Sequence, residues 1–265
     1  MRNVTLILDD GTCFSGQSFG YEKPVAGEVV FNTAMTGYPE SLTDPSYAGQ
    51  LMTLTYPLVG NYGVPPFSIE GNGRPAFMES EKIHAEAIIV SDYSENYSHW
   101  NAVESLADWL KREHVPGITG IDTRELTKVL REHGVMMGRI VFDDAMDNGE
   151  WKMDNYGEVN YVDRVSCKDI IVYAAGESKT FPVSTPKEEL NSQLSIFHSQ
   201  LKKVVLVDCG VKTNILRCLL RRGVEIIRVP WDYDFNQLSF DGLFILSSPP
   251  KKNCCVRFSV KKPRT

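Results

Sequence analysis

Apolar and polar positions in the first half of the chain predict short strands, separated by turns, and two helices. Val4–Leu8 is an apolar run and Leu51–Tyr56 alternates apolar residues with threonine, and both patterns are typical of strands. In the segment Thr123–His133, Leu126, Val129 and Leu130 recur at a helical spacing, so this segment is predicted as a helix. The other elements predicted here are strands at Glu28–Asn32, Ala85–Ser91 and Gly117–Asp122 and a helix within Ser105–His114.

The second half of the chain changes character near Lys203. Residues 143–200 are mixed and polar, which predicts an inter-domain linker with one short strand near Ile170–Tyr173. Beyond it, Val204–Val207 is a continuous apolar run of the kind found in strands buried on both faces. The helix predicted at Asn214–Arg222 and the strands predicted at Glu225–Val229 and Gly242–Leu246 follow. Strand, helix, strand and strand in this order predict the opening of a parallel α/β sheet.

Composition and charge exclude some classes of protein. Of the 265 residues, 42% are apolar and 23% charged, which is ordinary for a globular protein. Residues 251–265 hold six Lys or Arg and no acid, so residues 1–250 hold 22 basic and 34 acidic side chains, a net charge of −12. An acidic body argues against nucleic acid as the main partner, although the basic tail leaves a nucleic-acid arm as the alternative.

The chain shows no sign of a membrane segment or a disulfide framework. No apolar stretch has the length that spans a bilayer, and the apolar run near the N-terminus is too short for a signal peptide. The six cysteines have no CxxC spacing, and the five histidines are scattered, so no metal site is predicted. Free thiols fit a reducing compartment, and we expect a cytoplasmic protein without a membrane partner.

Three segments carry candidate chemistry. Thr36–Tyr47 is dense in Gly, Pro and hydroxyl residues, which indicates either a ligand loop or a network of turns. Asp122-Thr123-Arg124 opens a predicted helix, where the arginine either pairs with a partner's carboxylate or belongs to an ordinary capping motif. Val207–Lys212 joins a strand to a helix, but it matches neither glycine-rich phosphate motif, so we favour an ordinary turn over a nucleotide site.

No cysteine stands in the pattern of a catalytic nucleophile. A nucleophile elbow requires small neighbours, as in G-x-Nuc-x-G between a strand and a helix. Cys209 follows Asp208, whose negative charge opposes thiolate formation, and Cys254-Cys255 has no flanking glycine. We therefore predict no catalytic residue in this chain.

Three blocks together resemble one family. Gly27–Gly63 (GEVVFNTAMTGYPESLTDPSYAGQLMTLTYPLVGNYG), Gly117–Gly134 (GITGIDTRELTKVLREHG) and Val204–Gly223 (VVLVDCGVKTNILRCLLRRG) are similar, in this order, to the small, glutamine-hydrolysing subunit of carbamoyl-phosphate synthase. The resemblance divides the chain into an N-terminal small-subunit domain (1–145), a linker region (146–200), the start of a class I glutamine amidotransferase domain (201–246) and a non-matching basic tail (247–265).

The resemblance carries expectations about fold and activity. It implies an α/β protein, with a layered β/β/α N-terminal domain of the α+β kind that docks on a large synthetase subunit and an incomplete flavodoxin-like amidotransferase domain. In that family a cysteine thiolate, helped by a His and a Glu, releases ammonia from glutamine. The large subunit, where ATP and a divalent metal ion are expected, joins this ammonia to bicarbonate for the arginine and pyrimidine pathways. Ser46 stands where the family places a glutamine-contacting serine, so glutamine is the expected ligand, and no cofactor is expected in this chain.

The sequence departs from the family after Leu243–Leu246. The family continues with Ser-Asn-Gly-Pro-Gly-Asp-Pro, whereas this chain continues with Ser247-Ser248-Pro249-Pro250, and the Gly-x-Cys-x-Gly elbow has no counterpart. So abrupt an end to the similarity indicates a change of reading frame. Two hypotheses follow: a glutaminase subunit by family, or a catalytically dead truncated chain that acts at most as a docking module. The remnant of the amidotransferase sheet would expose the runs Val204–Val207, Ile226–Val229 and Leu243–Leu246, so we expect residues 200–265 either to be marginally stable or to rest on the N-terminal domain.

Overall fold

The computed structural model describes residues 2–70, 74–142, 159–174, 176–197 and 201–245. The chain divides into two compact units. The first unit combines Met1–Phe67 with Glu81–Val159, and the second combines Ser68–Ser80 with Asn160–Thr265. A short segment from the first third of the sequence therefore folds with the C-terminal half of the chain.

The first unit is built on a seven-stranded sheet that closes on itself. In spatial order the strands are β1 (Asn3–Leu8), β2 (Cys13–Ser18), β8 (Gly117–Thr119), β6 (Ala87–Ile89), β4 (Gln50–Leu54), β3 (Val25–Asn32) and β9 (Met136–Phe142), and β9 returns to β1. Strands β3, β4, β6 and β8 run parallel to one another, and the remaining pairings are antiparallel. A separate parallel pair joins β5 (Leu58–Val59) to β7 (Asp92–Tyr93).

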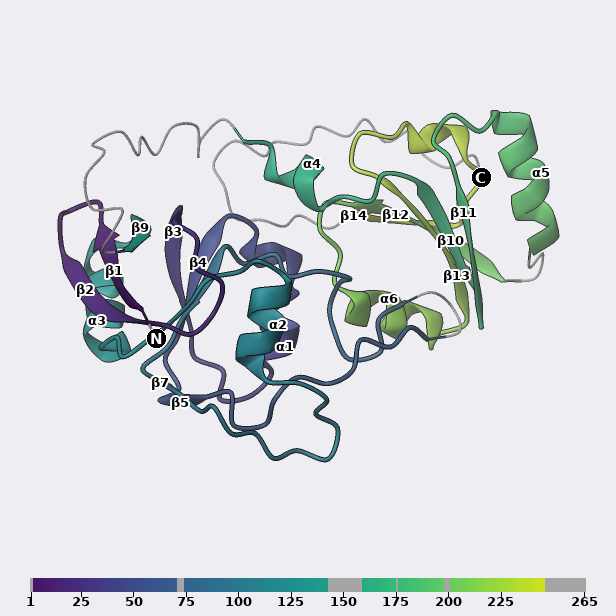
Figure 1. Ribbon diagram of the computed structural model, residues 1–265. Coiled ribbons are helices and arrows are strands. Elements are labelled where there is room, and N and C mark those ends of the chain that lie inside the picture. The colour runs from purple at the N-terminus through teal and green to yellow at the C-terminus, as the bar shows by residue number, and fades with distance from the viewer. Residues whose placement is uncertain (1, 71–73, 143–158, 175, 198–200, 246–265) are drawn as a thin grey trace. The chain divides into compact units, whose positions relative to one another are not determined.

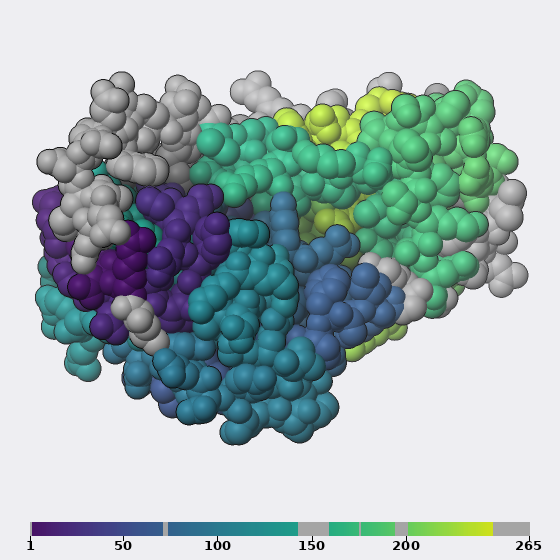
Figure 2. Space-filling model, in the orientation of Figure 1, coloured from purple at the N-terminus to yellow at the C-terminus, as the bar shows by residue number. Residues whose placement is uncertain are grey.

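The helices of the described part of the first unit are α1 (Tyr38–Leu42), α2 (Leu106–Arg112) and α3 (Thr123–His133). The sheet's main apolar core takes Val4, Leu6 and Leu8 from β1, because alternate residues of a strand point to the same face. Helix α3 adds Leu126 and Leu130 to the same core. On the face shown in Figure 2, the purple-to-teal side chains of this unit form a continuous surface.

Two strand glycines allow the closed sheet to pack closely. A Cβ at Gly16 would lie 2.5 Å from the carbonyl oxygen of Thr119, where β2 meets β8. A Cβ at Gly138 in β9 would lie 2.5 Å from a methyl group of Val29 in β3. Both distances are too short for carbon, so the backbone approaches of this sheet depend on glycine at these two positions.

The second unit holds a five-stranded mixed sheet. Figure 1 allows its strands to be followed, in green to yellow, in the order β11 (Glu177–Phe181), β10 (Ile170–Ala174), β13 (Val224–Pro230), β12 (Lys202–Asp208) and β14 (Gly242–Ile245). Strand β12 pairs in parallel with β13 and β14, β10 is antiparallel to β13, and β11 is antiparallel to β10. The helices are α4 (Tyr161–Val165), α5 (Lys187–Phe197) and α6 (Thr213–Leu220), with a 3₁₀ turn at Phe235–Gln237.

Both faces of this sheet are covered. On one face Val205, Val207 and Ile227 pack with Val162 of α4 and Leu190 of α5. On the other face Leu206 and Ile226 pack with Leu216 of α6. The central strands β12 and β13 are therefore buried on both sides, as their continuous apolar runs predict.

The expected class, a mixed α/β protein, is confirmed, and most predicted elements are present. The helix prediction at Thr123–His133 is confirmed to the residue, with Asp122 as its N-cap and Gly134, at φ 82°, at its end. The predicted parallel pairing of the strands at 204–207, 225–229 and 242–245 is also confirmed. The layered β/β/α and flavodoxin-like descriptions of the two domains stay predictions.

Several expectations differ from the structure. Thr36–Tyr47 is not only loop, since it contains α1 and a 3₁₀ turn at Pro45–Tyr47. The part of the expected linker from residue 160 to 197 forms α4, β10, β11 and α5 of the second unit, and β9 at Met136–Phe142 was not predicted. The sheet is mixed rather than purely parallel because β10 and β11 join it from this polar region.

The expected exposure of the apolar runs is wrong for two of the three. Val205, Leu206 and Val207 are fully buried, and so are Ile226 and Ile227. They are buried because β10 extends the sheet beyond β13 and helices cover both faces. In the third run, Leu243 and Phe244 are partly buried and Ile245 is exposed, since β14 is the edge strand; Leu246 and the basic tail lie outside the described residues.

Candidate functional site

Ser46 sits in the 3₁₀ turn Pro45–Tyr47 of the first unit, half-buried. The turn forms because the Asp44 carboxylate accepts a hydrogen bond from the backbone N–H of Ser46 at 2.9 Å, and because Pro45 fixes the backbone at its first position. Asp44 and Pro45 are both buried. The backbone that carries the Ser46 hydroxyl is therefore rigid before any ligand binds.

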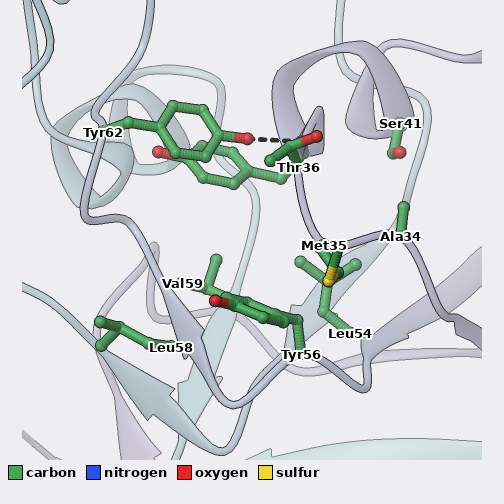
Figure 3. Close-up of a pocket in the computed structure, with 10 residues that line it drawn as sticks. Ala34, Met35, Thr36, Ser41, Leu54, Tyr56, Leu58, Val59 and Tyr62 are labelled. Atoms are coloured by element: carbon green, nitrogen blue, oxygen red, sulfur yellow. Dashed lines mark hydrogen bonds between the residues drawn. The ribbon is translucent and has the colours of Figure 1, made fainter.

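Helix α1, directly before this turn, is held by a pair of stacked tyrosines. The rings of Tyr38 and Tyr62 lie 4.2 Å apart at an angle of 22°. The Tyr62 hydroxyl accepts hydrogen bonds from the backbone N–H groups of Gly37 and Tyr38 at 2.7 and 3.0 Å, and the Tyr38 hydroxyl donates to the carbonyl of Gly63 at 2.6 Å. Figure 3 shows the stacked rings beside the start of α1. The first N–H groups of a helix have no acceptor within the helix. The Tyr62 hydroxyl, in the loop after β5, is the acceptor for the two N–H groups at the start of α1.

Burial keeps both tyrosines protonated. Removal from water raises the pKa of Tyr62 to about 12, although the two N–H groups that donate to its oxygen act in the opposite direction. Burial, reinforced by the neighbouring Tyr62, also raises the pKa of Tyr38 well above its usual value. The hydroxyl of Tyr38 consequently remains a donor across the physiological range of pH.

A small cavity lies between this pair and Tyr56. It measures about 10 Å³, and Ala34, Met35 and Leu58 are among its lining residues (Figure 3). Sites for organic ligands enclose roughly 300–1,000 Å³. The cavity is therefore a packing gap beside α1 and is far too small to hold glutamine.

The strand-to-helix turn after β12 is organised by the Asp208 carboxylate, which is fully buried. One of its oxygens accepts from the N–H groups of Gly210 and Val211, both at 2.9 Å, and the other accepts from the N–H of Cys167 at 2.7 Å and from the Arg228 guanidinium. The amides that a bound phosphate would need are already bonded to Asp208. The favoured interpretation, an ordinary structural turn, is therefore supported over a nucleotide site.

Two of the described cysteines, Cys167 and Cys209, are poor nucleophiles. Burial raises the pKa of the Cys167 thiol to about 12, with the Asp208 carboxylate adding to the rise, and Cys209 is 1% exposed. Cys254 and Cys255 lie outside the described residues. Within the part of the chain that the structure describes, no three His, Cys, Asp or Glu side chains are grouped so that they could hold a metal ion.

Asp122-Thr123-Arg124 forms the capping motif that was the alternative to a binding role. The Asp122 carboxylate accepts from the N–H of Glu125 at 2.8 Å. Arg124 is exposed, and the ion pair on this turn joins Lys128 to Glu125 instead. The cap is thus confirmed, while the guanidinium of Arg124 remains available to a ligand.

Comparison with known protein families identifies the first unit. Residues 6–140 match the family model described as carbamoyl-phosphate synthase small chain, CPSase domain. The match covers half of the chain and falls on the strands and helices from β1 to β9. The chain belongs to the carbamoyl-phosphate synthase small chain family.

Individual relatives agree with the small-chain assignment. The chain is 43% identical over 256 residues to multifunctional protein pyr1-3 of Dictyostelium discoideum and 42% identical over 252 residues to multifunctional protein CAD of Squalus acanthias. It is 40% identical over 253 residues to the mitochondrial carbamoyl-phosphate synthase (ammonia) of Homo sapiens. These matches cover 94–95% of this chain but only 10–15% of the relatives, so the chain spans a small part of the length of the proteins that it resembles.

The small-chain domain contains both Ser46 and the α3 cap, whereas the Asp208 turn lies in the second unit. The structure places Ser46 on a rigid turn, and its contact with glutamine stays a prediction. The Tyr38–Tyr62 pair that holds the start of α1 was not predicted from the sequence. The signal was present in the glycines beside each tyrosine, Gly37-Tyr38 and Tyr62-Gly63, but a stacked pair 24 residues apart has no local pattern.

Among the helices within the described ranges, none is both long enough and apolar enough to traverse a bilayer.

Proposed function

We propose that this chain acts in carbamoyl phosphate synthesis as the small-chain component, which supplies a large synthetase component with ammonia from glutamine. The observation that carries the proposal is the match of the small-chain domain to residues 6–140, which form a structured first unit. ATP and a divalent metal ion belong, in this proposal, to the large component, and the arginine and pyrimidine pathways consume the product. The cytoplasm is the proposed compartment.

Ser46 is the proposed glutamine contact. Its support is the geometry of the turn, in which Asp44 and Pro45 fix the backbone while the serine stays half-exposed. A hydroxyl held in this way binds an amide or carboxylate with little loss of conformational entropy.

A second candidate function is a docking module without catalysis. It is favoured by Cys167, whose pKa is raised to about 12 by burial, so this thiol supplies no thiolate near neutral pH, and by Cys209, which is buried out of reach of a substrate. In this version the first unit still binds the large component, and the chain releases no ammonia.

One reconstitution distinguishes the two functions. The chain is co-expressed with a carbamoyl-phosphate synthase large subunit, and carbamoyl phosphate formation is measured with glutamine and, separately, with ammonium chloride. Glutamine-dependent synthesis supports the ammonia-supplying role. Co-purification with synthesis from ammonia alone supports the docking role, and failure of the two chains to co-purify rejects both.

The role of Ser46 is tested in the same complex by Ser46→Ala, with Ser98→Ala, at an exposed position, as the matched control. Loss of one hydrogen bond to the ligand should raise the KM for glutamine about five-fold and leave ammonia-dependent synthesis unchanged. Should the complex prove to be only a docking assembly, glutamine affinity is measured instead by calorimetry. Equal behaviour of the two variants would remove Ser46 from the site.

A further inference from the structure

A cleft of about 520 Å³ lies in the first unit beside α3. Thr55 and Ser91, which follow β4 and β6, contribute to its wall, and so do Asp122, Thr123 and Arg124, which follow β8. These three strands are parallel, so their carboxyl ends share one edge of the sheet. Crevices outside the carboxyl ends of parallel strands are the usual ligand sites of open α/β sheets, and this closed sheet presents the same arrangement.

The cleft is lined by three cationic side chains from one face of α3. Arg124, Lys128 and Arg131 are spaced four and three residues apart, which places them on one side of the helix. The ammonium of Lys128 is 2.7 Å from the Glu125 carboxylate. Across the residues that the structure describes, neither Arg124 nor Arg131 has a carboxylate partner. On a chain whose net charge is −6, two guanidiniums in one cleft that have no carboxylate partner within the described residues indicate a local site for anions.

The acidic side chain on the cleft wall is Asp122, and its role is structural. Its Oδ1 atom accepts the N–H of Glu125 at 2.8 Å. Its single negative charge is outweighed by Arg124 and Arg131, which have no carboxylate partner among the described residues. The cap also occupies the helix N-terminus, so the proposed ligand is held by side chains rather than by the helix end.

Thr123 contributes a polar side chain to the cleft wall. It lines the cleft and is 4% exposed, yet its hydroxyl has no hydrogen-bond partner among the described residues. By contrast, the hydroxyl of Thr127, one turn along, donates to the Thr123 carbonyl at 2.6 Å. The Thr123 hydroxyl is not one of the side-chain atoms that are both buried and unpaired, so it is accessible from the cleft. A ligand oxygen in the cleft would be within reach of a hydrogen bond to it.

The chemistry of the wall defines the class of ligand. The lining contains no aromatic side chain, so nothing stacks with a nucleobase. The volume exceeds what one inorganic phosphate needs, and planar guanidiniums bind phosphate oxygens in pairs. We propose that this cleft is an anion site for a small molecule that carries two phosphoryl groups and no base, held by Arg124, Arg131 and Thr123. This site is independent of the proposed glutamine contact at Ser46.

The test is isothermal titration calorimetry of the full chain with inorganic pyrophosphate as the probe. We expect saturable binding of one pyrophosphate per chain that weakens as salt is added. Arg124→Gln and Arg131→Gln should each lower the affinity about ten-fold or more, since each removes a charge-assisted contact. Both positions are exposed and glutamine is a good helix former, so we expect the fold to persist, and the thermal midpoint checks it.

Arg221→Gln is the matched control, because Arg221 is an exposed arginine of the second unit and the change removes the same charge. The affinity of the Arg221→Gln variant for pyrophosphate should equal that of the unaltered chain. An equal loss in this variant would show that the binding is a general charge effect and would overturn the proposal, as would the absence of saturable binding.

Two further measurements, one with citrate and one with a Thr123 variant, define the ligand. Citrate carries carboxylates in place of phosphoryl groups, and tighter binding of citrate than of pyrophosphate would overturn the phosphoryl assignment. Thr123→Val keeps the shape of the side chain and removes the hydroxyl. The affinity of this variant for pyrophosphate should be several-fold lower, and an unchanged affinity would remove Thr123 from the site.

Discussion

The Asp208 carboxylate joins three separate segments of the second unit. It accepts hydrogen bonds from Cys167 before β10, from Gly210 and Val211 before α6, and from Arg228 in β13. Burial lowers the pKa of Arg228, but Asp208 together with Tyr173 and Cys167 outweighs that effect, so the pKa lies above its usual value and the guanidinium stays charged. The buried carboxylate and the partly buried guanidinium thus compensate each other.

Asp208→Asn should lower the free energy of unfolding by about 3 kcal/mol, because it leaves the charge of Arg228 without a counterion in a site where the carboxylate is 0% exposed. Urea denaturation followed by circular dichroism measures the change. The matched control is Asp241→Asn, which breaks the solvent-exposed ion pair with Lys202 in the same unit. The control should change stability little, and equal effects of the two variants would contradict the structural role assigned to Asp208.

Tyr62 makes stability depend on alkaline pH. Its pKa is raised from the ordinary value of 10 to about 12 by burial, so above pH 10 the unfolded chain loses this proton while the folded chain keeps it. Its contribution is fully present below pH 10 and is lost as pH rises towards 12. Tyr62→Phe removes this contribution and also leaves the N–H groups of Gly37 and Tyr38 without their acceptor, a loss of about 1–3 kcal/mol at pH 8.

The measurement is the difference in unfolding free energy between the unaltered chain and Tyr62→Phe at pH 8 and at pH 11. The difference should shrink at the higher pH. Tyr56→Phe is the control, because Tyr56 borders the same cavity and its hydroxyl has no hydrogen-bond partner among the described residues. A difference that stays constant with pH would show that Tyr62 does not titrate as proposed.

At the scale of elements, the contact between β2 and β8 depends on glycine, which has no side chain, at position 16. A Cβ on Gly16 would lie 2.5 Å from the Thr119 carbonyl and 2.9 Å from a methyl group of Ile118. Because the first of these is backbone, the two strands must separate to admit it. Gly16→Ala should therefore lower the unfolding free energy by about 1–3 kcal/mol, measured by urea denaturation.

Gly242→Ala, in β14, is the comparison. A Cβ there would meet Val204 at an ordinary 3.6 Å, so the change should be neutral or slightly stabilising through the unfolded chain. If Gly16→Ala is tolerated as well as Gly242→Ala, the close approach of β2 and β8 is not needed for closure of the sheet.

The elements that the sequence predicts are those with a strong local pattern. The helical spacing of Leu126 and Leu130 and the apolar run Val204–Val207 are sufficient, because each reports burial on a definite face. Strand β9 was missed because Gly138, which the close contact with Val29 requires, interrupts its apolar pattern. Strand β11 was missed because it is a polar edge strand, whose pairing with β10 is not encoded locally.

The candidate sites follow the same rule. A single helical pattern is enough to recognise the Asp122 cap and the spacing of Arg124, Lys128 and Arg131. By contrast, Thr55 and Ser91 line the cleft from the ends of strands that are distant in the sequence. Their position depends on the parallel order of β4, β6 and β8, which hydrophobic patterns do not specify. Ser46 entered by family resemblance, since a serine in a turn has no distinguishing chemistry of its own.

At the scale of the whole molecule, the second unit includes a segment from early in the sequence, Ser68–Ser80. The Arg217 guanidinium of α6 donates to the carbonyls of Pro75, Ala76 and Met78 at 2.5, 2.9 and 3.2 Å. The Glu79 carboxylate accepts from the N–H of Asn214 at 2.9 Å, and so supplies the side-chain cap that Lys212, at the N-cap position, does not. Helix α6 is therefore completed by residues more than 130 positions before it.

Arg217→Gln should release this segment. Hydrogen bonds to a charged group are worth about 1.5–3 kcal/mol, so a loss of about 2 kcal/mol corresponds to roughly thirty-fold faster amide exchange in the second unit. Hydrogen–deuterium exchange should show the change at β12 and β13, with the amides of β1 and β4 in the first unit unaffected. The control, Arg221→Gln, changes an exposed arginine just beyond α6 and should alter neither unit. Faster exchange in both units with Arg217→Gln would mean that they unfold as one, and unchanged exchange would mean that residues 74–79 do not stabilise α6.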